Sequence, residues 1–418
     1  MREARRASGM VWARFAREAG FGEAYLRNVE NGNRSVTAAV AAAYDRVLHT
    51  GDVFMAALHE TGSVTDLPWD RPGSLAVLTG LLEGNSVDRR GILSAGAALA
   101  VSAGNWSMAW EPIHATTASV ADGPALLTHV EDRLDHLRHL DDELGSGVVY
   151  QLARSELSLI VRLIRSCRYD GPTMAYLHSM ASEAARQTAW AAFDQGRPGI
   201  AQRFFDGSLR ASAEAGDPIS GAYGLSFAAI QCYSTPGQAG RAVSLLETAQ
   251  ERVKRRATPR MQAMLAARTA RALSKTGAKR ECARQLDLAR AALDKGTHDD
   301  DPRTLYWVDH GEIEMIAGSA ALDLGDPAEA VRRFEAAVQA SYPGDDEYPR
   351  SHAIYLARAA EAHIALHDLD AAVAGARHAV RCLGSVDSAR SATELKSLRE
   401  KLSPHVSYAA VREFLQAG

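Results

Sequence analysis

Residues 9–32 read GMVWARFAREAGFGEAYLRNVENG and contain two short helical patterns around a glycine-rich break. The first pattern places apolar residues at the i, i+4, i+5 and i+8 spacing of a packed helix face: Val11, Phe15, Ala16 and Ala19. After the break at Gly20 and Gly22, Leu26 and Val29 continue an apolar face at i, i+3. Glycine tolerates backbone dihedrals that other residues resist, so we expect a tight turn between two helices.

Two short helices joined by a glycine-containing turn of three or four residues are typical of a helix-turn-helix. The segment resembles the helix-turn-helix of the Cro and phage-repressor type over about residues 2–48. The resemblance is most specific in Phe15-Ala16, Ala19-Gly20 and Leu26-x-x-Val29-Glu30-Asn31-Gly32. It implies an internal ion pair between Arg5 and Glu30.

The resemblance also implies which residues contact DNA. We expect one group to face base edges in the major groove: Glu23, Ala24, Arg27 and Asn28. A second group is expected near phosphates: Arg14, Asn31, Asn33 and Arg34.

The sequence departs from the family at two places. Val11 and Trp12 stand where the family has Ser or Thr followed by Gln, which removes a capping hydroxyl and a phosphate contact. Glu23 is a carboxylate at a base-reading position, where phosphates repel it unless it accepts a hydrogen bond, for example from cytosine N4. The alternative is a vestigial helix-turn-helix that packs but no longer reads DNA.

Charge is unevenly distributed along the 418 residues, whose net charge is −4. Residues 1–48 contain eight arginines and five acidic residues, a net charge of +3, so the remainder carries −7. A basic head on an acidic body is the distribution expected when phosphate attraction is needed only at the head.

The cysteines and the lengths of the apolar runs indicate the cellular compartment of the protein. The four cysteines, Cys167, Cys232, Cys282 and Cys382, are far apart and form no CxxC motif, which favours reduced thiols in the cytoplasm. No run of 18 apolar residues occurs, so we expect no membrane partner.

The chain is expected to have three parts. Residues 1–50 form the helix-turn-helix domain, and residues 51–120 form a partly helical connector punctuated by glycine and proline. Residues 121–418 form an α-helical repeat domain. The segment from His136 to Gly145 resembles one that lies between head and repeats in actinobacterial regulators of this type.

The repeat is a glycine followed five residues later by a small residue. Four copies and a fifth with histidine are Gly196/Ala201, Gly237/Ala242, Gly277/Cys282, Gly325/Ala330 and His367/Ala372. Four residues after the small residue, most copies have a larger apolar residue: Phe205, Leu246, Leu286 and Phe334, with only Ala376 in the last copy. Three residues after that position, each copy has another small residue: Ser208, Ala249, Ala289, Ala337 and Ala379.

This recurrence predicts stacked helix pairs, with the glycine at the turn and the small residue where the two helices approach closely. It resembles the tetratricopeptide repeat, best over residues 324–337, although the period exceeds that family's 34 residues. We attribute the excess to longer helices and to linkers at residues 296–302 and 341–349. The fold class is therefore all-α, a helix-turn-helix domain followed by an α-solenoid of tetratricopeptide-like pairs. An unrelated helical bundle is the alternative.

One column of residues varies from repeat to repeat. Six residues before each turn stand Trp190, Gln231, Arg271, Ser319 and Glu361. In the tetratricopeptide family this place lines the concave groove. An aromatic, an amide and a guanidinium group suit a peptide or a small acidic molecule. The alternative is a solvated face without a ligand, or one that binds a protein partner.

Catalytic motifs are not visible: there is no P-loop, GxSxG elbow, HExxH or strand-associated GxGxxG. A stripe of His129, Asp132, His136 and His139 has helical spacing, but we interpret it as a solvated helix face rather than a metal site. We expect no enzyme, metal or cofactor. The expected function is a cytoplasmic, homodimeric transcription regulator that binds double-stranded DNA. A tetratricopeptide-like interaction scaffold with a vestigial head is the alternative.

Overall fold

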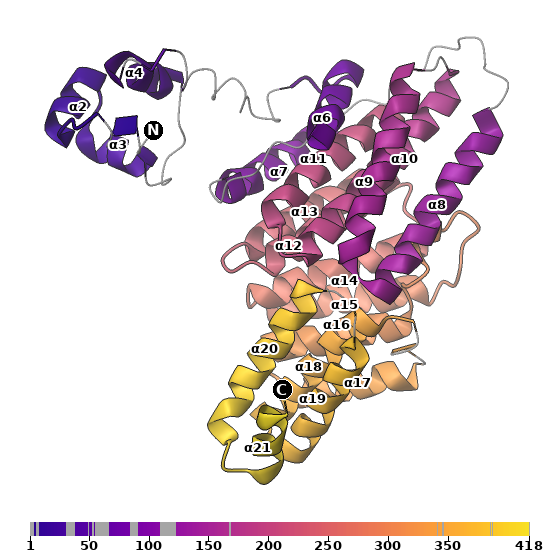
Figure 1. Cartoon of the computed structure of the whole chain (residues 1–418). Helices are drawn as coiled ribbons and strands as arrows, with labels where there is room; N and C mark the ends of the chain where they lie inside the picture. The colour runs from indigo at the N-terminus through magenta and orange to yellow at the C-terminus, as the bar shows by residue number, and fades with distance from the viewer. Residues whose placement is uncertain are drawn as a thin grey trace. The chain divides into compact units, whose positions relative to one another are not determined.

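The structure is a computed structural model of the whole chain, shown in Figure 1. It describes residues 4–5, 8–30, 38–48, 50–51, 54, 67–83, 91–108, 123–166, 169–340, 342–344, 347–384, 386 and 388–417. All regular elements in these ranges are helices and none is a β-strand, which confirms the predicted all-α class. The chain divides into two compact units, residues 1–68 with 86–98, and residues 69–85 with 99–418.

The first unit packs three helices around one apolar core: α2 (Trp12–Ala19), α3 (Glu23–Glu30) and α4 (Ala38–Leu48). Its buried members are Phe15, Ala16, Ala19, Leu26, Val29, Val40, Ala43, Tyr44 and Val47. Helix α2 ends at Gly20, whose φ of 76° is left-handed and whose amide donates to the carbonyls of Ala16 and Arg17. The sequence predicted that Val11 belongs to this core, and that prediction is wrong. Val11 precedes the helix in an extended conformation, so its side chain is 69% exposed.

A buried ion pair joins the start of the chain to the end of α3. Arg5 Nε lies 2.8 Å from Glu30 Oε1, and a second bond of 3.0 Å joins Arg5 to Glu30 Oε2. The Tyr44 hydroxyl donates to the same carboxylate at 2.9 Å. Arg5 and Glu30 are 8% and 3% exposed, so this predicted pair is confirmed as a desolvated, bidentate contact.

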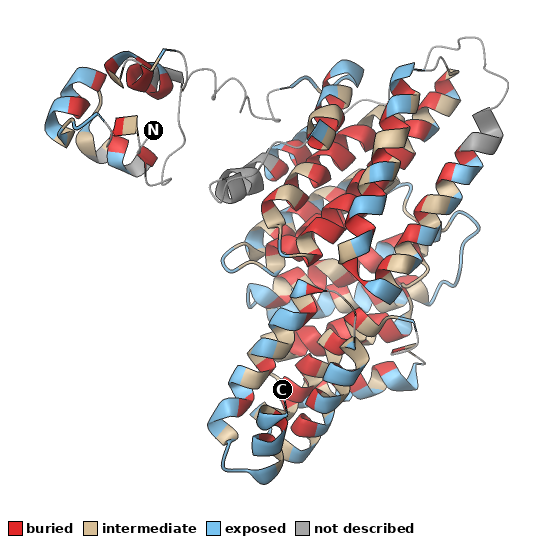
Figure 2. Cartoon of the chain, viewed as in Figure 1, coloured by how far each residue is buried: buried red, intermediate tan, exposed pale blue. Residues whose placement is uncertain are grey.

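The second unit is built from consecutive helices that pack in pairs. The pairs are α8 (Gly123–Leu144) with α9 (Ser146–Ser166), α10 (Gly171–Asp194) with α11 (Pro198–Ala215), α12 (Pro218–Tyr233) with α13 (Ala239–Val253), α14 (Pro259–Lys275) with α15 (Lys279–Leu293), α16 (His310–Asp323) with α17 (Pro327–Gln339), and α18 (Pro349–Ala365) with α19 (Leu369–Leu383). Figure 2 shows buried residues along the facing sides of these helices. No described helix is long and apolar enough to cross a lipid bilayer.

The turn inside each of the last five pairs is left-handed. Gly196, Gly237, Gly277 and Gly325 have φ between 73° and 77°, and His367 has φ 62°. Five residues later the small residue is at most 1% exposed in every pair: Ala201, Ala242, Cys282, Ala330 and Ala372. The repeated small residues therefore sit where the two helices of a pair meet, as the spacing predicted.

Further helices pack on the pairs. α6 (Arg71–Glu83) packs against α9 and α11, and the second half of α7 (Gly91–Met108) buries Trp106 beside Gly221. α20 (Ala389–Leu402) packs against α18 and α19, and α21 (Ala409–Gln416) packs against α19. Val411 and Phe414 of α21 are buried in a cluster with residues of α18, α19 and α20. The C-terminal helix therefore caps the last pair.

Candidate functional site

The exposed side of α3 carries a fixed arginine. Arg27 bonds Glu23 Oε1 through Nε at 2.9 Å and through a terminal nitrogen at 2.6 Å. Its guanidinium also lies 4.9 Å from the ring centroid of Trp12, and Arg5 lies 3.7 Å from the same ring. Trp12 therefore contacts Arg27 by a cation–π interaction.

The other residues predicted to contact DNA are only partly placed. Arg14 pairs with Glu18 at 2.8 Å, one turn further along the exposed side of α2. Ala24 and Asn28 lie on α3, but their side chains are outside the described residues. Asn31, Asn33 and Arg34 also lie outside the described residues. Both arginines that can be assessed therefore carry a neighbouring carboxylate.

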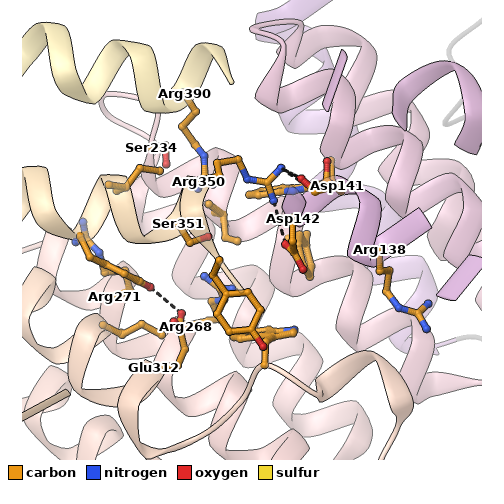
Figure 3. A pocket seen from close by; sticks show the side chains of 18 of the residues that line it. Arg138, Asp141, Asp142, Ser234, Arg268, Arg271, Glu312, Arg350, Ser351 and Arg390 are labelled. Carbon is orange, nitrogen blue, oxygen red and sulfur yellow. Dashed lines mark hydrogen bonds and ion pairs between the residues drawn. The ribbon is translucent and has the colours of Figure 1, made fainter. Parts of the chain in front are cut away.

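A cavity of about 170 Å³ lies inside the second unit (Figure 3). Its walls come from α8, α10, α12, α14, α16, α18 and α20, so the first helix of each pair contributes to it. Of the predicted column, Trp190, Arg271 and Ser319 line the cavity.

Gln231 and Glu361 do not line the cavity, because each side chain is used by a neighbouring helix. The Gln231 amide donates to the Pro198 carbonyl at the start of α11, at 2.9 Å. Glu361 lies 2.8 Å from Lys401 of α20 and 3.6 Å from Arg358. Four members of the column are less than 9% exposed: Trp190, Gln231, Ser319 and Glu361. The column is therefore a packed interior surface rather than a solvated face.

Two linkers between pairs add aromatic walls to the cavity. Tyr306 and Trp307 follow η2 (Arg303–Leu305) ahead of α16, and Tyr342 and Tyr348 precede α18. The Tyr306 hydroxyl donates to Asp142 at 2.5 Å, and its ring centroid lies 6.4 Å from that of Tyr348. The linkers that lengthen the repeat period thus fold over the side of the stack formed by the first helices.

Arg350 connects the two ends of the stack across the cavity. This arginine of α18 is 4% exposed and lies 2.8 Å from Asp141 and 3.6 Å from Asp142 of α8, as Figure 3 shows. Asp194 of α10 forms an ion pair with Arg390 of α20, with 3.3 Å between Asp194 Oδ1 and Arg390 Nε. Burial raises the pKa of Asp142 to about 6, although the charge of Arg350 opposes the shift.

Arg271, predicted to bind a ligand carboxylate, is already paired inside the protein. It shares Asp323 with Arg358 and Lys275, whose distances to that carboxylate are 2.5 Å and 3.0 Å. Burial, and then the neighbouring charge of Arg358, lower the pKa of Arg271 to about 10. Burial likewise lowers the pKa of Lys275 to about 7. Arg271 therefore already has a carboxylate partner inside the protein.

Arg268 is the cavity arginine that sequence reasoning missed. Among the described residues no carboxylate lies within 4 Å of it, whereas the other six arginines of the lining each have one: Arg138, Arg186, Arg271, Arg350, Arg358 and Arg390. Its guanidinium lies 4.9 Å from the ring centroid of Trp307 and 3.5 Å from the Tyr233 hydroxyl. Its buried Nε has no hydrogen-bond partner in the described part of the chain.

A simple signal would have found Arg268. It stands one helical turn before Arg271, nine residues before the turn glycine, and therefore on the same side of α14. The corresponding column reads Gln187, Ala228, Arg268, Ile316 and Arg358, and all but Ala228 line the cavity.

Glu312 is a buried carboxyl near Arg268. It is 7% exposed and accepts a hydrogen bond of 2.7 Å from the Tyr355 hydroxyl. Burial raises the pKa of Glu312 to about 7, and the positive charge of Arg268 opposes part of the rise. Figure 3 shows Glu312 and Arg268 near each other, away from the Arg350 cluster.

The cavity has the chemistry of a binding site. Tyrosine, tryptophan and phenylalanine supply flat apolar walls, and buried charges supply orientation. The histidine stripe of α8 is exposed, and no group of three potential metal ligands occurs among the described residues. No protein-family model matches the chain, and no curated protein sequence matches it.

Proposed function

We propose that the chain is a DNA-binding transcription regulator of the repressor type, whose second unit is a tetratricopeptide-like α-solenoid that senses an effector. The observation that carries this proposal is the geometry of the first unit. Helices α2 and α3 are eight residues each and are joined through a left-handed Gly20. The buried pair of Arg5 and Glu30, which the resemblance implied, ties the start of the chain to α3.

The solenoid proposal is supported by the repeated left-handed turns and by the buried small residue five positions later. In such repeats each pair buries its remaining face against the next pair. The cavity lies among the first helices of these pairs, which is where solenoids of this kind bind their ligands. A cavity lined by polar and aromatic side chains supports a peptide or small-molecule effector.

A homodimer is part of the proposal. One recognition helix of eight residues contacts few base pairs, and helix-turn-helix proteins usually read two half-sites about one DNA turn apart. Sedimentation of the full chain should give a dimer with DNA. A monomer bound to one half-site, at micromolar protein, would contradict this part.

DNA binding is tested with the full-length protein and an oligonucleotide selected from a random library. Affinity should fall steeply with salt because bound phosphates release counterions. Arg27→Ala should lower the affinity for the selected site by about 1–3 kcal/mol if Arg27 contacts a guanine, with a smaller effect on random DNA. Arg332→Ala on α17, where the arginine is also exposed and paired with a glutamate, is the matched control.

The competing function is an interaction scaffold with a vestigial head. Its supporting observation is that Arg14 and Arg27 are each neutralised by a carboxylate of their own helix. A scaffold of this kind would select no sequence from the library and would show no DNA affinity at low salt. That result would refute the regulator proposal.

A further inference from the structure

We propose that the cavity binds a small organic anion with a flat aromatic body, and that Arg268 receives its carboxylate. The inference deepens the proposed effector function and rests on it. It concerns the chemical class of the effector, which the predicted column left open between a peptide and a small acidic molecule.

The first step is charge. A guanidinium taken out of water is costly unless a counter-charge compensates it. The other cavity arginines obtain that compensation from neighbouring carboxylates, as shown above. Arg268 has a 3.5 Å contact with the Tyr233 hydroxyl and lies near the faces of aromatic rings. The nearby carboxyl of Glu312 acts on it through charge but lies beyond 4 Å, and Arg268 Nε has no hydrogen-bond partner among the described residues. An incoming carboxylate supplies the missing counter-charge and the missing acceptor.

The second step is shape. Trp307 lies 4.9 Å from the Arg268 guanidinium, and Phe227 lies 5.9 Å from it. Phe227 in turn contacts Trp190 edge to face, with centroids 4.9 Å apart. These rings border the cavity together with further cations, since Arg186 lies 4.5 Å over the Phe227 ring and Arg390 lies 4.7 Å over the Trp190 ring. A molecule that places its carboxylate on Arg268 therefore lays its body against aromatic rings, where a flat ring packs best.

The third step is size. The cavity holds about 170 Å³, enough for roughly ten water molecules or one small organic molecule. Arg350 with Asp141, and Tyr306 with Asp142, bridge it from opposite ends of the stack. An extended peptide would have to break these bridges, whereas a compact aromatic acid would not. The observations therefore favour the small acid.

The test uses full-length protein and three acid–amide pairs: benzoate with benzamide, salicylate with salicylamide, and indole-3-acetate with indole-3-acetamide. Binding is measured by calorimetry. At least one acid should bind with a Kd below about 1 mM, and its amide should bind at least about tenfold more weakly, the effect expected of a charge-assisted hydrogen bond.

Arg268→Met keeps the length of the side chain and removes its charge. This variant should lose the preference for the acid over the amide, whereas Arg268→Lys should keep part of it and Arg332→Met on the surface of α17 should keep all of it. Circular dichroism and the melting temperature establish that each variant is folded.

Two outcomes would overturn the inference: none of the three acids binds with a Kd below about 1 mM, or Arg268→Met binds acid and amide as the wild type does. The salt-dependent DNA assay is run on the same samples. Intact DNA binding without acid binding refutes only the effector class, and loss of both refutes the proposed function as well.

Discussion

The pH dependence of stability should identify Glu312 as a buried carboxyl that resists ionisation. The perturbation is Glu312→Gln, which preserves the size of the side chain and removes its titration. Glu312 is 7% exposed and accepts a hydrogen bond from Tyr355. Burial raises its pKa to about 7, from about 4.5 in an unfolded chain.

The sign follows from which state holds the proton. Between pH 4.5 and pH 7 the folded protein keeps the Glu312 proton that the unfolded chain releases, so the free energy of unfolding falls as pH rises. A pKa raised from about 4.5 to about 7 corresponds to about 3 kcal/mol over the whole window, and most of this lies between pH 5 and pH 8. The stabilising contribution is therefore complete only at acidic pH.

The assay is urea unfolding of the full chain at pH 5 and pH 8, followed by tryptophan fluorescence. The loss of stability on going from pH 5 to pH 8 should be about 2–3 kcal/mol smaller in Glu312→Gln than in the wild type. Asp142, which titrates in the same direction, is present in both proteins and cancels. Glu247→Gln, at an exposed position of α13, should behave as the wild type. Agreement of Glu312→Gln with the wild type to within about 0.5 kcal/mol would refute the reasoning.

Three further substitutions test the packing described above. Arg5→Ala leaves Glu30 buried without its partner and should destabilise the first unit by about 3–5 kcal/mol, with loss of DNA binding but retention of most helical circular dichroism; unchanged DNA binding would contradict the role of the pair. Gly221→Ala drives a methyl group into the Trp106 ring and should cost about 1–3 kcal/mol in urea unfolding, so an unaltered midpoint would show that α7 does not dock there. His367→Gly relieves a left-handed conformation at a non-glycine residue and should raise the melting temperature by an amount equivalent to about 0.5–1 kcal/mol; a fall would mean that the imidazole makes a contact worth more than the strain.

The helical content and the pairing of helices could be predicted because they depend on local rules. Apolar spacing marks a helix, and a residue with positive φ followed five positions later by a small residue marks the turn of a close pair. These rules hold even at His367, where the glycine is replaced and the left-handed turn persists. Val11 was the exception. An apolar residue just before a helix fits the spacing but has an extended backbone, so it points into solvent.

The cavity was predicted only in part because its chemistry depends on contacts between distant residues. Of the five residues in the predicted column, Trp190, Arg271 and Ser319 line it, whereas Gln231 and Glu361 do not. No sequence pattern indicates that Arg271 pairs with Asp323, which lies 52 positions later in the chain. The linker residues Tyr306 and Trp307 belong to no periodic pattern, so no sequence pattern indicated that they line the cavity.

Ion pairs that line the cavity join the first and last helices of the stack. In a simple array each pair contacts only its neighbours, and a ligand affects the pairs it touches. Here Arg350 of α18 reaches Asp141 of α8 across 209 positions, and Arg390 of α20 reaches Asp194 of α10. The two ends of the array are thereby joined through charges that line the same cavity. A ligand bound there would contact groups from both ends at once, and it would shift the conformation of the array only by its difference in affinity between two forms. The closing ion pairs, more than the individual repeats, are thus the element through which an effector would act.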